Sequence, residues 1–78
     1  MADDQLHALI TDHLRASGEP VREAFLFERI GGAATCTPEH FQDALLRLEV
    51  EGHVHMDPVH DEHRDPTPFQ PRFWRVID

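Results

Sequence analysis

The sequence lacks several features on which whole classes of proteins depend. Its single cysteine, Cys36, excludes an internal disulfide, whereas a secreted chain of this size usually carries several disulfides. No apolar stretch approaches the ~20 residues that a membrane-spanning helix requires, and the acidic start of the chain resembles neither a signal peptide nor a targeting helix. We therefore expect a soluble, cytoplasmic protein in which Cys36 is a small buried hydrophobic residue.

Lysine is absent as well, so all seven cationic side chains are arginines. Against them stand 15 aspartate and glutamate residues, which gives a formal net charge of -8. Nucleic-acid-binding proteins usually have a cationic excess, because contacts with phosphates supply much of their affinity. The field of this chain should instead repel DNA, unless a local basic patch overrides it.

The sequence also has no G-x-S-x-G, P-loop or Rossmann glycine motif. Glu39 and Asp43 are close together, but we expect them on a convex helix surface, whereas catalysis needs a concave pocket that excludes water. The sequence therefore predicts a protein that is not an enzyme, with no catalytic residues, no cofactor and no small-molecule substrate.

What the chain does contain is a regular order of elements, in a length that suits one domain over residues 1–78. Apolar residues first recur at helical spacing at Leu6, Leu9, Ile10 and Leu14. Ser17-Gly18 is expected to end this helix. Residues 19–22 are predicted to be extended and to lead into a second helix over residues 23–30, which Gly31-Gly32 closes.

A third helix is predicted over about residues 37–51. Thr37 is a good N-cap, and Pro38 suits the first helical position. Four apolar residues follow at i, i+3, i+4 and i+7, which places them on one inward face: Phe41, Ala44, Leu45 and Leu48. Gly52 is expected to end the helix.

Two stretches near the C-terminus, residues 53–56 and 72–77, alternate with the period of a strand. Trp74 should pack inward, while Arg72 and Arg75 should be solvated. The acidic segment between the strands, residues 57–71, contains most of the prolines and is predicted to be a stiffened hairpin loop. Together these elements predict a small α+β domain of three helices and a C-terminal two- or three-stranded β-hairpin.

The stretch from Leu26 to Met56 resembles the winged helix-turn-helix superfamily. Its segment LFERIGG resembles the end of a second helix, and TPEHFQDALLRLEVEGHVH resembles a recognition helix that runs into a wing. Within the latter, ALLRLEVEGHV matches the usual pattern of a leucine-rich helix that ends in glycine before an apolar strand. The resemblance implies a wing over residues 53–77. In bacterial transcription regulators of this fold, the third helix enters the DNA major groove and the wing contacts the backbone.

Three features depart from that pattern. The link from Gly31 to Cys36 is longer than a tight helix-turn-helix turn. The third helix presents carboxylates and aliphatic residues outward, where DNA-reading members present Arg, Lys, Asn or Gln. The loop of the wing, residues 57–71, is acidic, with Arg64 as its single cation beside four carboxylates: Asp57, Asp61, Glu62 and Asp65.

We therefore predict protein–protein recognition or self-association through the third helix and the acidic wing. The alternative is DNA binding as a transcription regulator. The acidic rim suits a basic protein or a second copy of the chain. Six residues are candidates for partner binding: Glu39, Gln42, Asp43, Leu46, Val50 and Phe25.

Histidines are dense in the predicted wing, at His53, His55, His60 and His63, with carboxylates at Asp57, Asp61 and Glu62. Imidazole and carboxylate groups can together bind zinc, nickel or copper. Because their spacing matches no standard metal motif, the sequence predicts a solvated polar wing, and these four histidines are only alternative metal ligands.

Overall fold

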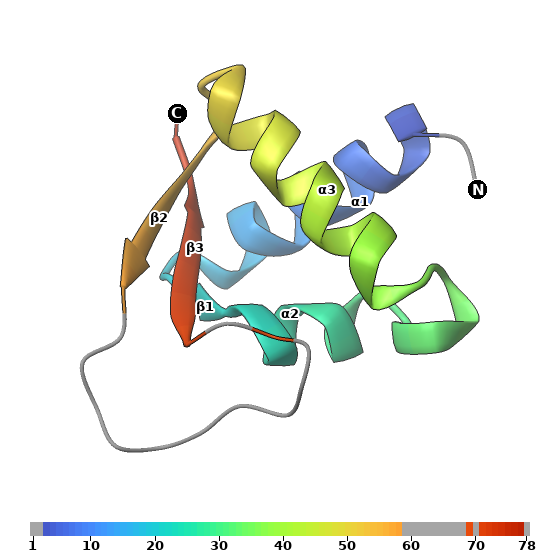
Figure 1. Cartoon of the computed structure of the whole chain (residues 1–78). Coiled ribbons are helices and arrows are strands. Elements are labelled where there is room, and N and C mark those ends of the chain that lie inside the picture. The colour runs from blue at the N-terminus through green and yellow to red at the C-terminus, as the bar shows by residue number, and fades with distance from the viewer. Residues whose placement is uncertain (1–2, 59–68, 70, 78) are drawn as a thin grey trace.

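The computed structural model describes residues 3–58, 69 and 71–77. Within them it has three α-helices and a three-stranded antiparallel sheet of order β1-β3-β2, so the predicted α+β class is confirmed (Figure 1). The elements in chain order are α1 (Asp3–Ser17), β1 (Val21–Arg22), α2 (Glu23–Arg29), the 3-10 helix η1 (Gly32–Ala34), α3 (Pro38–Val50), β2 (Val54–Pro58) and β3 (Arg72–Val76). No helix in this part of the chain combines the length and the apolar character needed to cross a bilayer.

Strand β3 is central in the sheet and pairs with two strands that are distant from each other in the sequence, β1 and β2. It pairs with β1 through Val21 and Trp74, and with β2 through Val54 and Val76 and through Met56 and Trp74. The side chains of Val21, Val54 and Trp74 are buried against the helices. The sequence left the number of strands open between two and three, and the short extended segment before α2 supplies the third.

Helix α1 follows the predicted periodicity. Leu6, Ile10 and Leu14 are fully buried, and Leu9 packs at the edge of the core. The helix ends at Ser17, because Gly18 adopts a left-handed φ of 70° and donates its N–H to the carbonyl of Leu14. This conformation costs glycine little, which is why glycine is common at this place.

Helix α3 also begins and ends where its sequence indicates, within one residue of the predicted bounds. The Thr37 hydroxyl accepts a hydrogen bond of 3.1 Å from the His40 N–H, and Pro38 is the first helical residue. The buried face is the predicted one: Phe41, Ala44, Leu45 and Leu48. At the other end, Gly52 has a φ of 83° and turns the chain into β2.

The N-cap gives a testable stability effect. T37A should lower the free energy of unfolding by about 1 kcal/mol, because the His40 N–H loses its acceptor. Urea unfolding followed by the fluorescence of the only tryptophan, the buried Trp74, measures this change. T11A is a matched control, since the Thr11 hydroxyl only donates back to helix carbonyls and alanine favours a helix interior. Equal losses for both variants would contradict a specific capping role.

An aromatic cluster closes the core beneath α3. The rings of Phe27 and Phe41 lie 5.2 Å apart, and Phe69 lies 5.1 Å from Phe27 and 6.4 Å from Phe41. Phe27 comes from α2, whereas Phe69 comes from the segment before β3, which the sequence assigned to a polar loop. The three rings therefore tie that segment to the helices.

Three expectations need correction. Asp57 and Pro58 belong to β2 and not to the loop, and this is possible because β2 is an edge strand with Pro58 as its last residue. Arg72 is not solvated, since its side chain is 18% exposed and pairs with Glu23. Cys36 is only partly buried, although its burial raises the pKa of its thiol above the usual value.

Candidate functional site

The outward surface of α3 carries two of the four large apolar side chains that are exposed in the described part of the chain, and they lie next to each other. Val50 is 86% exposed and Leu46 is 43% exposed. They lie one turn apart and nearer the C-terminal end of α3 than Asp43 and Glu39, which are exposed on the same side of the helix. We call these four residues, Glu39, Asp43, Leu46 and Val50, the outer face of α3. Helical periodicity explains it, because the opposite stripe is committed to the core.

Charges surround the two aliphatic residues. Asp43, Arg47 and Glu51 line a shallow hollow together with Leu46 and Val50. Arg47 is the only arginine of α3, and it lies four residues from both Asp43 and Glu51, which makes all three helical neighbours. Glu51 also lies 3.5 Å from the imidazole of His53. The result is an apolar centre bordered by carboxylates, with a single cation among them.

The other two predicted partner-binding residues lie elsewhere. Gln42 is partly buried, and its amide donates a 3.2 Å hydrogen bond to Glu23, so it belongs to the interior side of α3. Phe25 is 49% exposed, but it projects from α2, where the Arg29 guanidinium lies 4.7 Å from its ring centre. The structure thus brings together four of the six candidates and separates Gln42 and Phe25 from them.

Sequence reasoning missed a buried carboxylate, Glu23, at the start of α2. It is fully buried, and Oε1 accepts hydrogen bonds from Arg72 Nε and, at 3.1 Å, from Trp74 Nε1. Oε2 accepts the bond from Gln42. A glutamate in a first helical turn is normally exposed and stabilised by the helix dipole, so nothing in the local sequence signals this network. It ties α2 to α3 and β3.

Every buried side-chain nitrogen and oxygen among the described residues has a hydrogen-bond partner. The Glu23 network therefore holds no unsatisfied group that a substrate would complete. The Glu23 network is buried and all of its groups have partners, which is typical of hydrogen bonds that hold together elements distant in the sequence. We call this structural role a brace.

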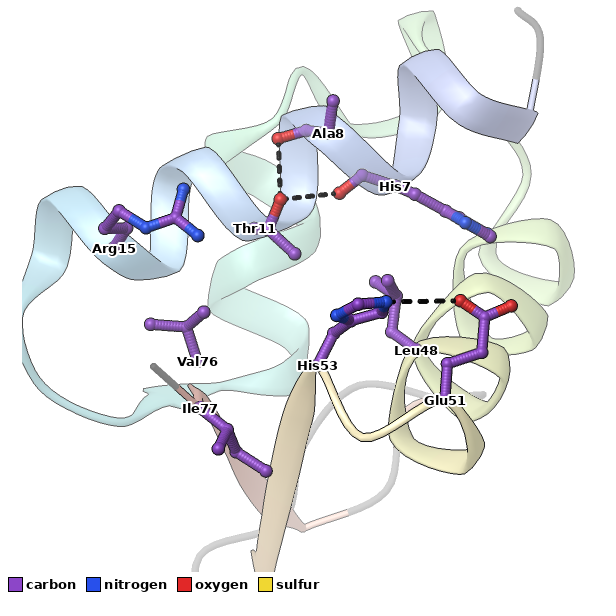
Figure 2. Close-up of a pocket in the computed structure, with 9 residues that line it drawn as sticks. All are labelled: His7, Ala8, Thr11, Arg15, Leu48, Glu51, His53, Val76 and Ile77. Carbon is purple, nitrogen blue, oxygen red and sulfur yellow. Dashed lines mark hydrogen bonds and ion pairs between the residues drawn. The ribbon is translucent and has the colours of Figure 1, made fainter.

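A second hollow opens between α1, the end of α3, the start of β2 and the end of β3 (Figure 2). In it the Thr11 hydroxyl donates to the carbonyls of His7 and Ala8, at 3.0 and 3.1 Å, and the His53 imidazole turns toward Glu51 (Figure 2). Its other lining residues are Arg15, Leu48, Val76 and Ile77. The Thr11 hydroxyl, the His53 imidazole and, through Asp12, the Arg15 guanidinium are thus engaged within the protein.

The predicted histidine cluster is not assembled in the described chain. His53 pairs with Glu51, while His55 pairs with Asp57 at 3.2 Å, and Asp57 also accepts a bond from Arg75. His60 and His63 lie outside the described residues. Within residues 3–58, 69 and 71–77, no group of three or more potential metal ligands comes together.

Comparisons with known proteins add no relative. No protein-family model matches the sequence, and neither the curated proteins nor the solved structures yield a match. The functional conclusion therefore depends on the chain's own surface chemistry.

Proposed function

We propose that this chain is a non-enzymatic winged-helix module of the cytoplasm that binds a protein partner through the outer face of α3. One observation carries the proposal: Leu46 and Val50 are exposed side by side and bordered by carboxylates. The partner is expected to present apolar side chains flanked by cations. The order of the elements and the packing of α3 against α1 and β2 are consistent with a winged helix.

The exposed pair has the chemistry of a small interface. Single exposed aliphatic residues are common on protein surfaces, but two neighbours on one helix turn form a continuous apolar patch. Burying them against a partner would remove this apolar surface from water. Carboxylates at the rim would then favour the approach of a cationic partner, as charges around an apolar centre do in protein interfaces.

DNA binding is the less supported alternative. The outer face of α3 would place Glu39 and Asp43 against phosphates, with Arg47 as the only cation of that helix. Of the three arginines in the sheet, Arg72 pairs with Glu23, Arg75 pairs with Asp57, and Arg22 lies over the ring of Phe73. Phosphate contacts need cations that gather on one side, and the third helix and its neighbouring strands do not provide such a group.

A peptide titration tests the proposal. The probe is a synthetic amphipathic helix with leucine and arginine on one face, added to the isotopically labelled protein and followed by amide NMR shifts. The shifts should cluster on the outer face of α3. L46D should weaken the binding ~10-fold or more, because a charge replaces the centre of the apolar patch.

Ile77 provides a matched control, since it is 45% exposed against 43% for Leu46 but directly follows β3. I77D should leave the peptide affinity within ~2-fold of the wild type, because it removes similar apolar surface outside the proposed interface. Equal weakening by L46D and I77D, or shifts confined to other elements, would refute the proposal. A salt-sensitive gel shift with duplex DNA would favour the alternative.

A further inference from the structure

A second surface feature lies away from α3, where β1 meets α2 and β3. Residues from these elements line a hollow there: Ser17, Glu19, Pro20, Val21, Arg22, Phe25, Arg29 and Phe73. The guanidinium of Arg29 lies 4.7 Å from the Phe25 ring, and that of Arg22 lies 5.7 Å from the Phe73 ring. We call this the arginine–phenylalanine hollow.

The hollow combines cations with exposed aromatic surface. Phe25 is 49% exposed, and Glu19 is the only carboxylate in the lining, against two arginines. The Arg29 guanidinium, stacked on the face of Phe25, still presents N–H groups at its edge, where a carboxylate can accept them. The hollow therefore suits an occupant with apolar side chains next to carboxylates.

The outer face of α3 has this chemistry, with Leu46 and Val50 beside Asp43 and Glu39. We propose that the partner bound by α3 is a second copy of the chain, whose arginine–phenylalanine hollow receives the outer face of α3. This proposal rests on the function proposed above and names the partner. Carboxylates would meet guanidinium groups, and the two aliphatic residues would cover the exposed edge of Phe25.

The two surfaces are different, so the contact is heterologous and can repeat from copy to copy. In Figure 1 the C-terminal half of α3 lies at the top, whereas β1 and the start of α2 lie at the bottom. One copy can therefore engage two neighbours at once. The net charge of -8 opposes association at long range, but screening beyond ~8 Å at physiological salt leaves the local pairs effective. Because both patches are small, the association should be weak.

Complementation of two disabled surfaces tests the proposal. Sedimentation equilibrium of the wild type between ~20 µM and ~1 mM, the range of a weak contact, should show a mass that rises with concentration. L46D, which disables the α3 surface, and R29E, which disables the hollow, should each remain monomeric. An equimolar mixture should form a 1:1 dimer that does not grow, because only one intact pair of surfaces remains. Circular dichroism checks that both variants are folded.

The outcomes separate this proposal from the preceding one. A wild type that stays monomeric throughout the range overturns self-association, while binding of the basic peptide would still support the α3 interface. Association that L46D abolishes and R29E leaves intact indicates contact between two α3 surfaces and overturns the role of the hollow. A mixture of the variants that stays monomeric also overturns it.

Discussion

Replacing Glu23 with alanine should lower the free energy of unfolding by ~3–5 kcal/mol, the usual cost of removing one partner from a buried ion pair. Arg72, Trp74 and Gln42 would all lose the acceptor that they share inside the protein. A domain is typically stabilised by ~5–15 kcal/mol, and a core this small belongs at the lower end. We therefore expect E23A to be only marginally stable, with ~0–2 kcal/mol remaining, as measured by urea unfolding followed by circular dichroism at room temperature.

Two comparisons isolate the network. E28A changes an exposed glutamate of the same helix and should alter stability by less than ~0.5 kcal/mol, as surface substitutions usually do. E23Q/R72M should lose less than the sum of E23Q and R72M, since each single change strands a partner that the double change removes. The network would not be a brace if E23A lowered the free energy of unfolding by less than ~0.5 kcal/mol. Additive losses of stability for E23Q and R72M in the double variant would show the same.

The elements that the sequence predicts well are those specified by neighbours in the chain. Thr37 and Pro38 define the start of α3, and Gly52 defines its end. Each acts within one turn of helix, through a cap, a fixed φ or a left-handed conformation. The outward position of Leu46 and Val50 follows from the same periodicity, and their exposure confirms it.

The features that the sequence does not predict depend on contacts between distant residues. Glu23 meets Arg72 only because β1 pairs with β3 and places both side chains beneath the sheet. Phe69 joins the core because Phe27 and Phe41 offer aromatic faces there. A proline-rich acidic segment gives no periodicity that would reveal one inward ring, and a buried ion pair leaves no local pattern at all.

The candidate site also contains residues whose positions the sequence predicts and residues whose positions it does not predict. Gln42 follows the buried Phe41 and lies at the border between the inward and outward faces of α3. Helical spacing alone permits the Gln42 side chain to point to either face. In the structure it points inward, because its amide donates a hydrogen bond to the carboxylate of Glu23. For Phe25, helical spacing correctly predicts a position off the buried face of α2. It does not predict how far Phe25 lies from the outer face of α3, because only the tertiary fold places one helix relative to another.

Replacing Phe41 with alanine should destabilise the protein as much as replacing Glu23, because it removes packing contacts instead of a charge. F41A should lower the free energy of unfolding by ~3–5 kcal/mol, because it leaves a cavity where a fully buried ring contacts Phe27 and Phe69. Urea unfolding followed by Trp74 fluorescence measures the change. F41L should recover part of the loss, since it refills some of the cavity with apolar volume.

Phe25 supplies the matched control for F41A. It is the same residue type on a neighbouring helix, but it is 49% exposed and contacts Arg29 in a surface cation–π pair. F25A should therefore lose less than ~1 kcal/mol. It should also weaken the self-association proposed above, because Phe25 lines the hollow. F41A would weaken it only by unfolding the domain. If F41A and F25A lose similar stability, the aromatic cluster does not hold the core together, and α3 has some other support.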